Sequence, residues 1–428
     1  MSKTVGKILL VLYFFAFTIP QNVAGLYIVF DRLSIQVLYI SVLNLFVILY
    51  LLRSLNLKFF IDHIRYKNHY ISYLLVIICS FISLIYAENI VEGIITFSKF
   101  FSLFISFSLI IYIVFKSKID FVKLFFMFIV VALIAETYVI NSKIFKTVIV
   151  DGNLLTRSME FRGFTGNINI SSFSILIKLP ALIYLIYNEK KYLHLFLLNL
   201  LLISSFVSIL ALFSRAAIIG LILLIIISLL YYLVKEKRKV VLQTILVSLS
   251  VCLSYLTYNF LNEKNTFDLI EERFSTVTKP SSDESVSQRV TFYRIALDDI
   301  KNYPLTGVGI GNWKLSSIQR ANEVLGGYMV PYVVHNDFLE IGAESGILSL
   351  FSYFFFIFFP FIILLKRSID FRNNNLYFLV LTCLFIYIFD SLINFPMHRV
   401  VSAINLYFIL AFFYYITIKN NHDVKKYF

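Results

Sequence analysis

Apolar runs of membrane-spanning length fill most of the chain, and one long polar stretch separates the ninth run from the tenth. A helix needs roughly 20 apolar residues to cross a bilayer core of about 30 Å. Windows of this kind predict twelve transmembrane helices, near residues 8–30, 33–52, 70–86, 95–115, 119–140, 168–187, 193–213, 216–234, 240–260, 338–365, 375–395 and 400–418. The pattern therefore predicts an all-α polytopic membrane protein.

The predicted helices divide the chain into three parts. Residues 1–260 hold helices one to nine, residues 261–337 form a long exterior loop, and residues 338–428 hold helices ten to twelve with a short tail. We expect the exterior loop to carry part of the functional site, because a polar substrate would bind at a polar stretch rather than within segments that lie in lipid.

The exterior loop has its own local order. Helical spacing occurs at 271–274 and at 288–303, where Val290, Tyr293, Ala296, Leu297 and Ile300 fall on one stripe before Pro304. Alternate glycines at 307, 309 and 311 resemble part of a dinucleotide fingerprint. No strand precedes them, so we interpret them as tight turns near the bilayer surface.

Composition and charge agree with a membrane protein. Of the 428 residues, 59% are hydrophobic and only 15% are charged, which excludes a soluble protein of this length. If the N-terminus lies inside, more than half of the 38 lysines and arginines fall in interior segments, as the positive-inside rule requires. We therefore predict that both termini are cytoplasmic. The net charge of +13 needs no nucleic-acid partner, because basic residues at interior helix ends contact membrane lipids.

The sequence predicts neither a metal nor a cofactor. Cys79, Cys252 and Cys383 each stand alone in an apolar run, so we expect no disulfide framework and no zinc site. No Asp-x-Asp occurs in an exterior loop, and the adjacent Asp298 and Asp299 diverge around a helix. We therefore expect chemistry without a divalent cation.

Polar residues gather at the exterior ends of the predicted helices. Asp337, Glu340 and Glu344 follow His335 on one face of the helix that re-enters the membrane. Carboxylates are costly in lipid, so we expect them to face protein or water, and some could pair with arginines. The predicted topology brings one set of residues to the same leaflet, namely Arg162, Arg215, Arg289, Arg294, His335, Asp390, Asn394, His398 and Arg399.

Two of these residues also have purely structural interpretations. Arg215 stands at the outer boundary of helix seven, where an arginine is costly unless it is paired or hydrated, and it could be a snorkelling anchor. His335 could be a hydrogen-bonded structural histidine. The convergence on one leaflet favours a functional site.

The set suits glycosyl transfer from a lipid diphosphate. Guanidinium groups bind diphosphate oxygens in pairs and stabilise the charge on a departing diphosphate. A neutral imidazole takes a proton from an attacking hydroxyl at neutral pH. We therefore interpret His335 as the base and the arginines as ligands of the diphosphate.

The stretch from Arg289 to Leu350 resembles the signature of the O-antigen ligase and O-antigen polymerase superfamily. The resemblance rests on PLTGVGIGNW at 304–313, HNDFLE at 335–340 and ESGIL at 344–348. Supporting similarities are Ser214-Arg215, GNIN at 166–169 and NFP at 394–396. The similarity also extends to the twelve-helix layout.

The resemblance implies an inner-membrane, metal-independent, inverting glycosyltransferase that takes a glycan from undecaprenyl diphosphate on the periplasmic side. In the ligases the acceptor is a lipid A core sugar, and in the polymerases it is another lipid-linked repeat unit. An arginine–glycine spacing found in some polymerases is absent from the exterior loops, which favours a ligase.

The resemblance also implies roles for single residues. By position, His335 matches the essential histidine of the family, and Arg215 and Arg289 match arginines that bind the diphosphate. Further candidates follow from the same interpretation, with Arg294 and Arg162 on the diphosphate and Asp337, Glu340 and Glu344 in support.

Two function classes other than an enzyme stay open. A lipid-linked oligosaccharide transporter would share the topology and use Lys99, Glu136, Lys178 and Asp390 as midplane coupling residues. Transporters concentrate function at the midplane, however, whereas here polar residues gather on one leaflet. We expect Lys178 to face the lipid-diphosphate cavity or pair with Glu136, and Lys99 and Asp390 to snorkel near an outer end. An envelope scaffold, the third class, predicts that His335→Ala leaves glycan assembly unchanged.

Overall fold

The computed structural model describes residues 1–19, 34–52, 67–117, 119–151, 158–236, 241–261, 284–326, 329–366 and 375–419. Across these ranges the regular structure is helical, without a strand. Within the same ranges, ten segments are long and apolar enough to cross a membrane. The structure therefore confirms an all-α polytopic membrane protein.

The ten spans correspond to predicted helices three to twelve. They are formed by α4 (Lys67–Ser83) with η3 (Leu84–Tyr86), α5 (Ile90–Lys116), α6 (Phe121–Asp151), α7 (Ile168–Leu176) with α8 (Leu179–Asn188), α9 (Tyr192–Leu212), α10 (Arg215–Glu236), α11 (Val241–Leu261), α16 (Ile347–Lys366), α17 (Asn375–Ile393) and α18 (Val400–Lys419).

The two remaining predicted helices, 8–30 and 33–52, are only partly described. Their described parts are α1 (Lys3–Phe14), the 3-10 helix η1 (Phe15–Thr18) and α2 (Ser34–Leu51), which is apolar but shorter than the ten spans. The segment 20–33 of this prediction lies outside the described residues.

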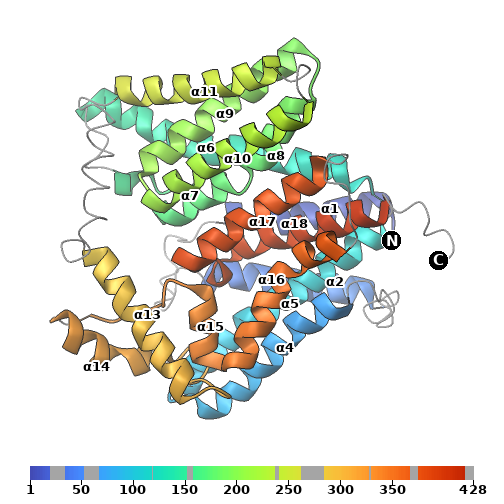
Figure 1. The fold of residues 1–428 in the computed structure, drawn as a ribbon. Helices are drawn as coiled ribbons and strands as arrows, with labels where there is room; N and C mark the ends of the chain where they lie inside the picture. The colour runs from blue at the N-terminus through green and yellow to red at the C-terminus, as the bar shows by residue number, and fades with distance from the viewer. Residues whose placement is uncertain are drawn as a thin grey trace.

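The spans pack side by side, with α18 at the centre. Figure 1 shows α6 to α11 above and α2, α4, α5 and α16 below, with α1, α17 and α18 between them. α18 contacts α5 on one side and α6 on the other, and it is buried along almost its whole length. The start of α1 and the end of α18 lie at the right of the view, opposite α13 and α14 at the left (Figure 1).

The prediction of a single helix over 338–365 is wrong. α15 (Asp337–Ser345) ends and α16 begins on either side of Gly346, whose φ is +85°. A Cβ at this glycine would lie 2.5 Å from the Leu305 carbonyl oxygen, and Ile347 donates its N–H to the Pro304 carbonyl at 2.7 Å. The break lets the loop after α13 pack here, so α15 belongs to the exterior part of the molecule.

An exterior unit is formed by α13 (Glu284–Asn302), α14 (Trp313–Leu325) and α15, around a small core of its own. Phe292, Trp313 and Val334 are buried in that core, and the Phe292 and Trp313 ring centroids lie 5.9 Å apart. This core places the start of α15 against α13 and α14.

α13 confirms the helix predicted at 288–303, but its buried face differs from the predicted stripe. Ile295 and Ala296 are buried, whereas Val290 and Leu297 are exposed. α14 was not predicted, because its polar composition gives no apolar period, and the predicted helical spacing at 271–274 lies outside the described residues.

The glycine-rich loop fixes α15 against the start of α5. Gly307, Gly309 and Gly311 have φ of +65°, +99° and +70°, which confirms the predicted tight turns. A Cβ on Gly309 would lie 2.5 Å from the Cα of Ala87, so the loop rests directly on that segment. Val308 donates its N–H to the Ala343 carbonyl at 2.8 Å, which joins the loop to α15.

Candidate active site

His335 lies in a tight turn directly before α15. Its φ is +63°, a left-handed conformation that costs an L-residue roughly 1–2 kcal/mol. Val334 donates its N–H to Glu340 Oε2 at 2.8 Å, and the Tyr293 hydroxyl donates to the His335 carbonyl oxygen at 3.0 Å. Asn336 caps α15 through its side-chain oxygen. The turn is therefore held by side chains on both sides of His335.

The imidazole of His335 does not behave as a hydrogen-bonded structural group. Its Nδ1 is buried and has no hydrogen-bond partner in the part of the chain that the structure describes. The Phe395 ring packs edge-on against it, 5.2 Å between centroids. Burial lowers the pKa of His335 to about 4, the charges of Arg289 and Arg399 act in the same direction, and Glu340 opposes them. At pH 7 the imidazole is therefore neutral and able to accept a proton.

Two carboxyl groups of α15 bond to the short helix η7 (Pro396–His398), which follows α17. Glu340 Oε1 lies 2.9 Å from His398 Nε2, and Asp337 Oδ2 accepts the Met397 N–H at 3.0 Å. Burial acts to raise the pKa of Glu340, but His398 and the Val334 N–H outweigh it, so the pKa of Glu340 lies below its usual value. Glu340 is therefore a buried anion that joins the His335 turn to η7.

Asp337 and Glu344, unlike Glu340, tend to keep their protons. Burial raises the pKa of Asp337 well above its usual range, and its Oδ1 has no hydrogen-bond partner among the described residues. Burial likewise raises the pKa of Glu344 to about 8, and Glu344 Oε1 accepts the Trp313 N–H at 3.3 Å. The structure thus places the three predicted supporting residues on α15, the helix that follows His335, each with a different partner.

The structure brings two guanidinium groups near His335. Arg289, on α13, is half-buried and acts electrostatically on both His335 and Tyr293. Arg399 follows η7, and its Cζ lies 4.7 Å from the centroid of the same Phe395 ring that packs on His335. The sequence predicted Arg399 and His335 at the same leaflet, and the fold shows that both side chains pack against one Phe395 ring.

The other predicted arginines are not joined to His335 by any described contact. Arg162 and Arg294 have exposed side chains. Arg215 begins α10, whose main neighbours are α7 and α17, and the residue two positions earlier, Phe213, has a left-handed φ of +54°. Their role in diphosphate binding stays a prediction.

Lys178 confirms its predicted pairing with Glu136. Its Nζ lies 2.9 Å from both carboxylate oxygens of Glu136 and donates to the Ser174 carbonyl at 2.6 Å. The pair lies where the predicted helix 168–187 breaks into α7 and α8. The predicted snorkelling of Lys99 and Asp390 is wrong, because both side chains are buried within the protein.

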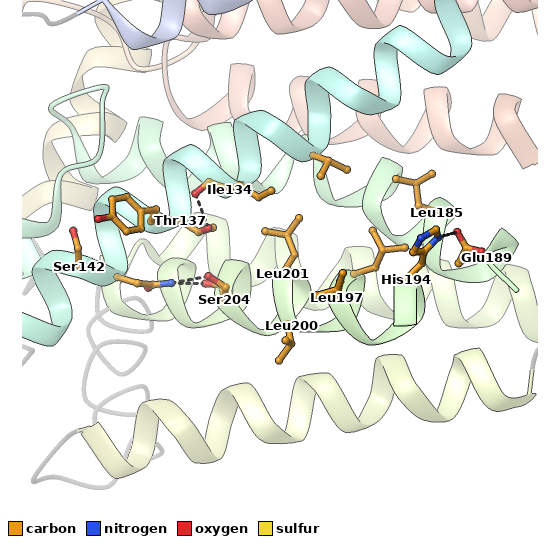
Figure 2. Close-up of a pocket in the computed structure, with 14 residues that line it drawn as sticks. Ile134, Thr137, Ser142, Leu185, Glu189, His194, Leu197, Leu200, Leu201 and Ser204 are labelled. Atoms are coloured by element: carbon orange, nitrogen blue, oxygen red, sulfur yellow. Dashed lines mark hydrogen bonds and ion pairs between the residues drawn. The ribbon is translucent and has the colours of Figure 1, made fainter. Parts of the chain in front are cut away.

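A groove of about 750 Å³ lies elsewhere, between α6 and α9 (Figure 2). Apolar side chains, mostly leucines, alternate along its walls with polar ones such as Thr137 and Ser142. Asn141 donates to Ser204 at 2.8 Å, and Glu189 lies 3.1 Å from His194 at one end of the groove (Figure 2). No predicted site residue lines it, so this groove is separate from the candidate active site.

Metal-ligand side chains do not cluster in the described ranges. Among those residues, no group of three or more His, Cys, Asp or Glu side chains is placed to hold a metal ion. Cys79, Cys252 and Cys383 are free thiols. Metal independence stays a prediction.

The fold and the site define a polytopic helical membrane protein with an imidazole and two guanidinium groups in an exterior unit. Residues 200–354 match the family model described as O-antigen ligase. The chain therefore contains an O-antigen ligase family domain, which confirms the resemblance in its sequence and supports a membrane enzyme of the O-antigen ligase or polymerase type. The matched segment includes Arg215, Arg289 and His335 but ends before Arg399. No curated protein matches the chain.

Proposed function

We propose that this protein transfers a glycan from undecaprenyl diphosphate to an acceptor hydroxyl, a lipid A core sugar, on the periplasmic side of the inner membrane. The observation that carries the proposal is the neutral His335 imidazole, unbonded at Nδ1 within the described chain and influenced by Arg289, inside the segment that matches the ligase family. Family membership supports a glycosyltransferase-like enzyme, and the site supplies its base and its anion-binding groups.

The proposed reaction is a single displacement with inversion. The acceptor oxygen forms a bond to the anomeric carbon of the donor glycan while the bond from that carbon to the diphosphate oxygen breaks. The departing undecaprenyl diphosphate keeps the electron pair, and the proton of the acceptor hydroxyl passes to His335. Arg289 stabilises the charge that grows on the diphosphate, and Arg215 is a second proposed ligand, with Arg294 and Arg162 further out.

Fixed positioning supports the assignment of His335 as the base. Val334, Tyr293 and Asn336 hold the turn around it, so the imidazole needs little reorganisation when substrate binds. Glu340 and Asp337 support the turn and η7, and Glu344 supports the start of α14, rather than acting on substrate. In this proposal the reaction needs no metal, and the termini are cytoplasmic, as the distribution of basic residues predicts.

The direct test uses the full chain reconstituted with an undecaprenyl-diphosphate-linked glycan and a lipid A core acceptor. His335→Ala is expected to lower the transfer rate about 100- to 10,000-fold, because general-base catalysis contributes that much. The thermal unfolding midpoint serves as the folding control. Full activity of a folded His335→Ala protein, or activity that is lost to a chelator and restored by magnesium, contradicts the mechanism.

A deletion strain distinguishes the alternatives, with surface polysaccharide resolved on a gel. Loss of a ligase leaves polymer on the carrier lipid and off the core, whereas loss of a polymerase leaves core capped with single repeat units. A transporter would instead leave unpolymerised donor on the cytoplasmic leaflet, and a scaffold would tolerate His335→Ala. Complementation with wild type and with His335→Ala separates these cases in one experiment.

A further inference from the structure

η7 is locked to the helix that follows His335. Asp337 and Glu340 lie one turn apart on α15 and bind consecutive residues, the N–H of Met397 and the ring of His398. Asn336, at the start of the same helix, donates to the Leu392 carbonyl at the end of α17 at 3.3 Å. The segment that leads into Arg399 is therefore fixed relative to His335 through α15.

The side chain of Arg399 also reaches the site. Its Cζ lies 4.7 Å from the Phe395 ring centroid, and the same ring lies 5.2 Å from the His335 ring. A guanidinium that stacks over an aromatic face directs its N–H groups sideways, in the plane of the fork. The site thus holds two arginines on separate supports, Arg289 on α13 and Arg399 after η7.

We propose that Arg399 binds the diphosphate of the lipid donor together with Arg289, beside His335. This inference rests on the proposed function and adds a residue that lies outside the segment matched by the family model. Two guanidinium groups from different elements suit a ligand with two adjacent phosphates, because each planar fork takes one pair of oxygens.

Binding of the diphosphate at this subsite also changes the pKa of His335. Without donor, burial, Arg289 and Arg399 hold the pKa of His335 at about 4. A bound diphosphate offsets the two positive charges, so the pKa of His335 rises when the donor is in place. The imidazole becomes a stronger base at the time when a proton has to be accepted.

The test measures binding of farnesyl diphosphate to the full chain in lipid nanodiscs by calorimetry, with farnesol as the uncharged comparison. Arg399→Met is expected to weaken farnesyl diphosphate binding about ten- to hundredfold, and Arg399→Lys less, because lysine keeps the charge but loses the planar fork. Lys301→Met, which removes an exposed positive charge from α13, is the matched control and is expected to bind as wild type does.

Two further measurements distinguish diphosphate binding by Arg399 from a purely structural role, and the results expected for diphosphate binding are as follows. Binding to the anion should depend less steeply on salt in Arg399→Met than in wild type, and the acid limb of kcat/KM should move to higher pH, since one charge that depresses the pKa of His335 is gone. If Arg399→Met does not fold, Arg399→Lys carries the test. Wild-type affinity in a folded variant overturns the role of Arg399 alone. A wild-type protein that does not bind farnesyl diphosphate overturns the proposed donor as well.

Discussion

Ionisable side chains are buried in two regions of this molecule, and the regions differ in how completely these groups are hydrogen-bonded. Within the membrane spans, Lys178 lies 2.9 Å from both oxygens of Glu136 and also donates to Ser174. In the exterior unit, His335 Nδ1 and Asp337 Oδ1 have no partner among the described residues, and His335 keeps a left-handed backbone.

The difference separates a structural cluster from a functional one. A buried ion pair with a full set of hydrogen bonds fixes the packing of its helices and leaves nothing for a ligand to bind. Unbonded buried atoms and backbone strain cost stability and occur together where a ligand completes the arrangement. Lys178 and Glu136 therefore belong to the fold, and the residues around His335 belong to the chemistry.

The largest expected effect is on stability and comes from Lys178→Met. The change leaves the Glu136 carboxylate buried without its partner, which costs about 3–5 kcal/mol of unfolding free energy. The double variant Lys178→Met/Glu136→Met is expected to recover most of that loss, because no charge stays buried. Unfolding in a denaturing detergent measures both. Equal stabilities for wild type and the single variant would contradict the structural role of the Lys178–Glu136 pair.

A smaller effect concerns the pH dependence of stability through Glu344. Burial raises its pKa from 4.5 to about 8, so between those values the folded state holds a proton that the unfolded state has released. Stability is therefore expected to fall as pH rises through this window, by about 1 kcal/mol per pH unit, and to change no further above it. Glu344→Gln removes this contribution, so the stability difference between wild type and variant should depend on pH. A constant difference contradicts the protonated state of Glu344.

The smallest effect isolates the strained backbone at His335. His335→Gly and His335→Ala remove the same imidazole, and both should lose transfer activity. Glycine tolerates the φ of +63°, so we expect the glycine variant to be more stable than the alanine variant by up to about 1 kcal/mol. Thermal unfolding of the two proteins tests this order. An alanine variant that is the more stable of the two argues against strain in the turn.

Hydropathy predicted the spans well because the bilayer imposes their length. It could not predict the break at Gly346, which depends on the Leu305 carbonyl packing where a Cβ would be. Nor could it find α14, whose polar sequence has no span-length apolar run. These elements are set by contacts within the exterior unit rather than by the membrane.

The candidate site was predictable in part for a similar reason. His335 and Arg289 lie within a local motif, and the structure brings Arg289 close enough to act on the imidazole. Arg399 reaches the same ring only because Asp337 bonds to Met397, a residue 60 positions further along the chain. Long-range bonds of this kind leave no periodic signal in one sequence. The left-handed turn at His335 could not be predicted either, because no glycine stands at that position to indicate it.

α15 has a consequence for how a bulky donor can enter. This helix of 9 residues directly follows the His335 turn, and two of its side chains bond to η7, which precedes Arg399. His335 and the backbone at Arg399 are therefore held by one rigid element. A movement of α15 would therefore shift His335 and Arg399 together and leave the distance between them unchanged. Accommodation of differently sized sugars would therefore have to come from elements that are not fixed to α15 and η7.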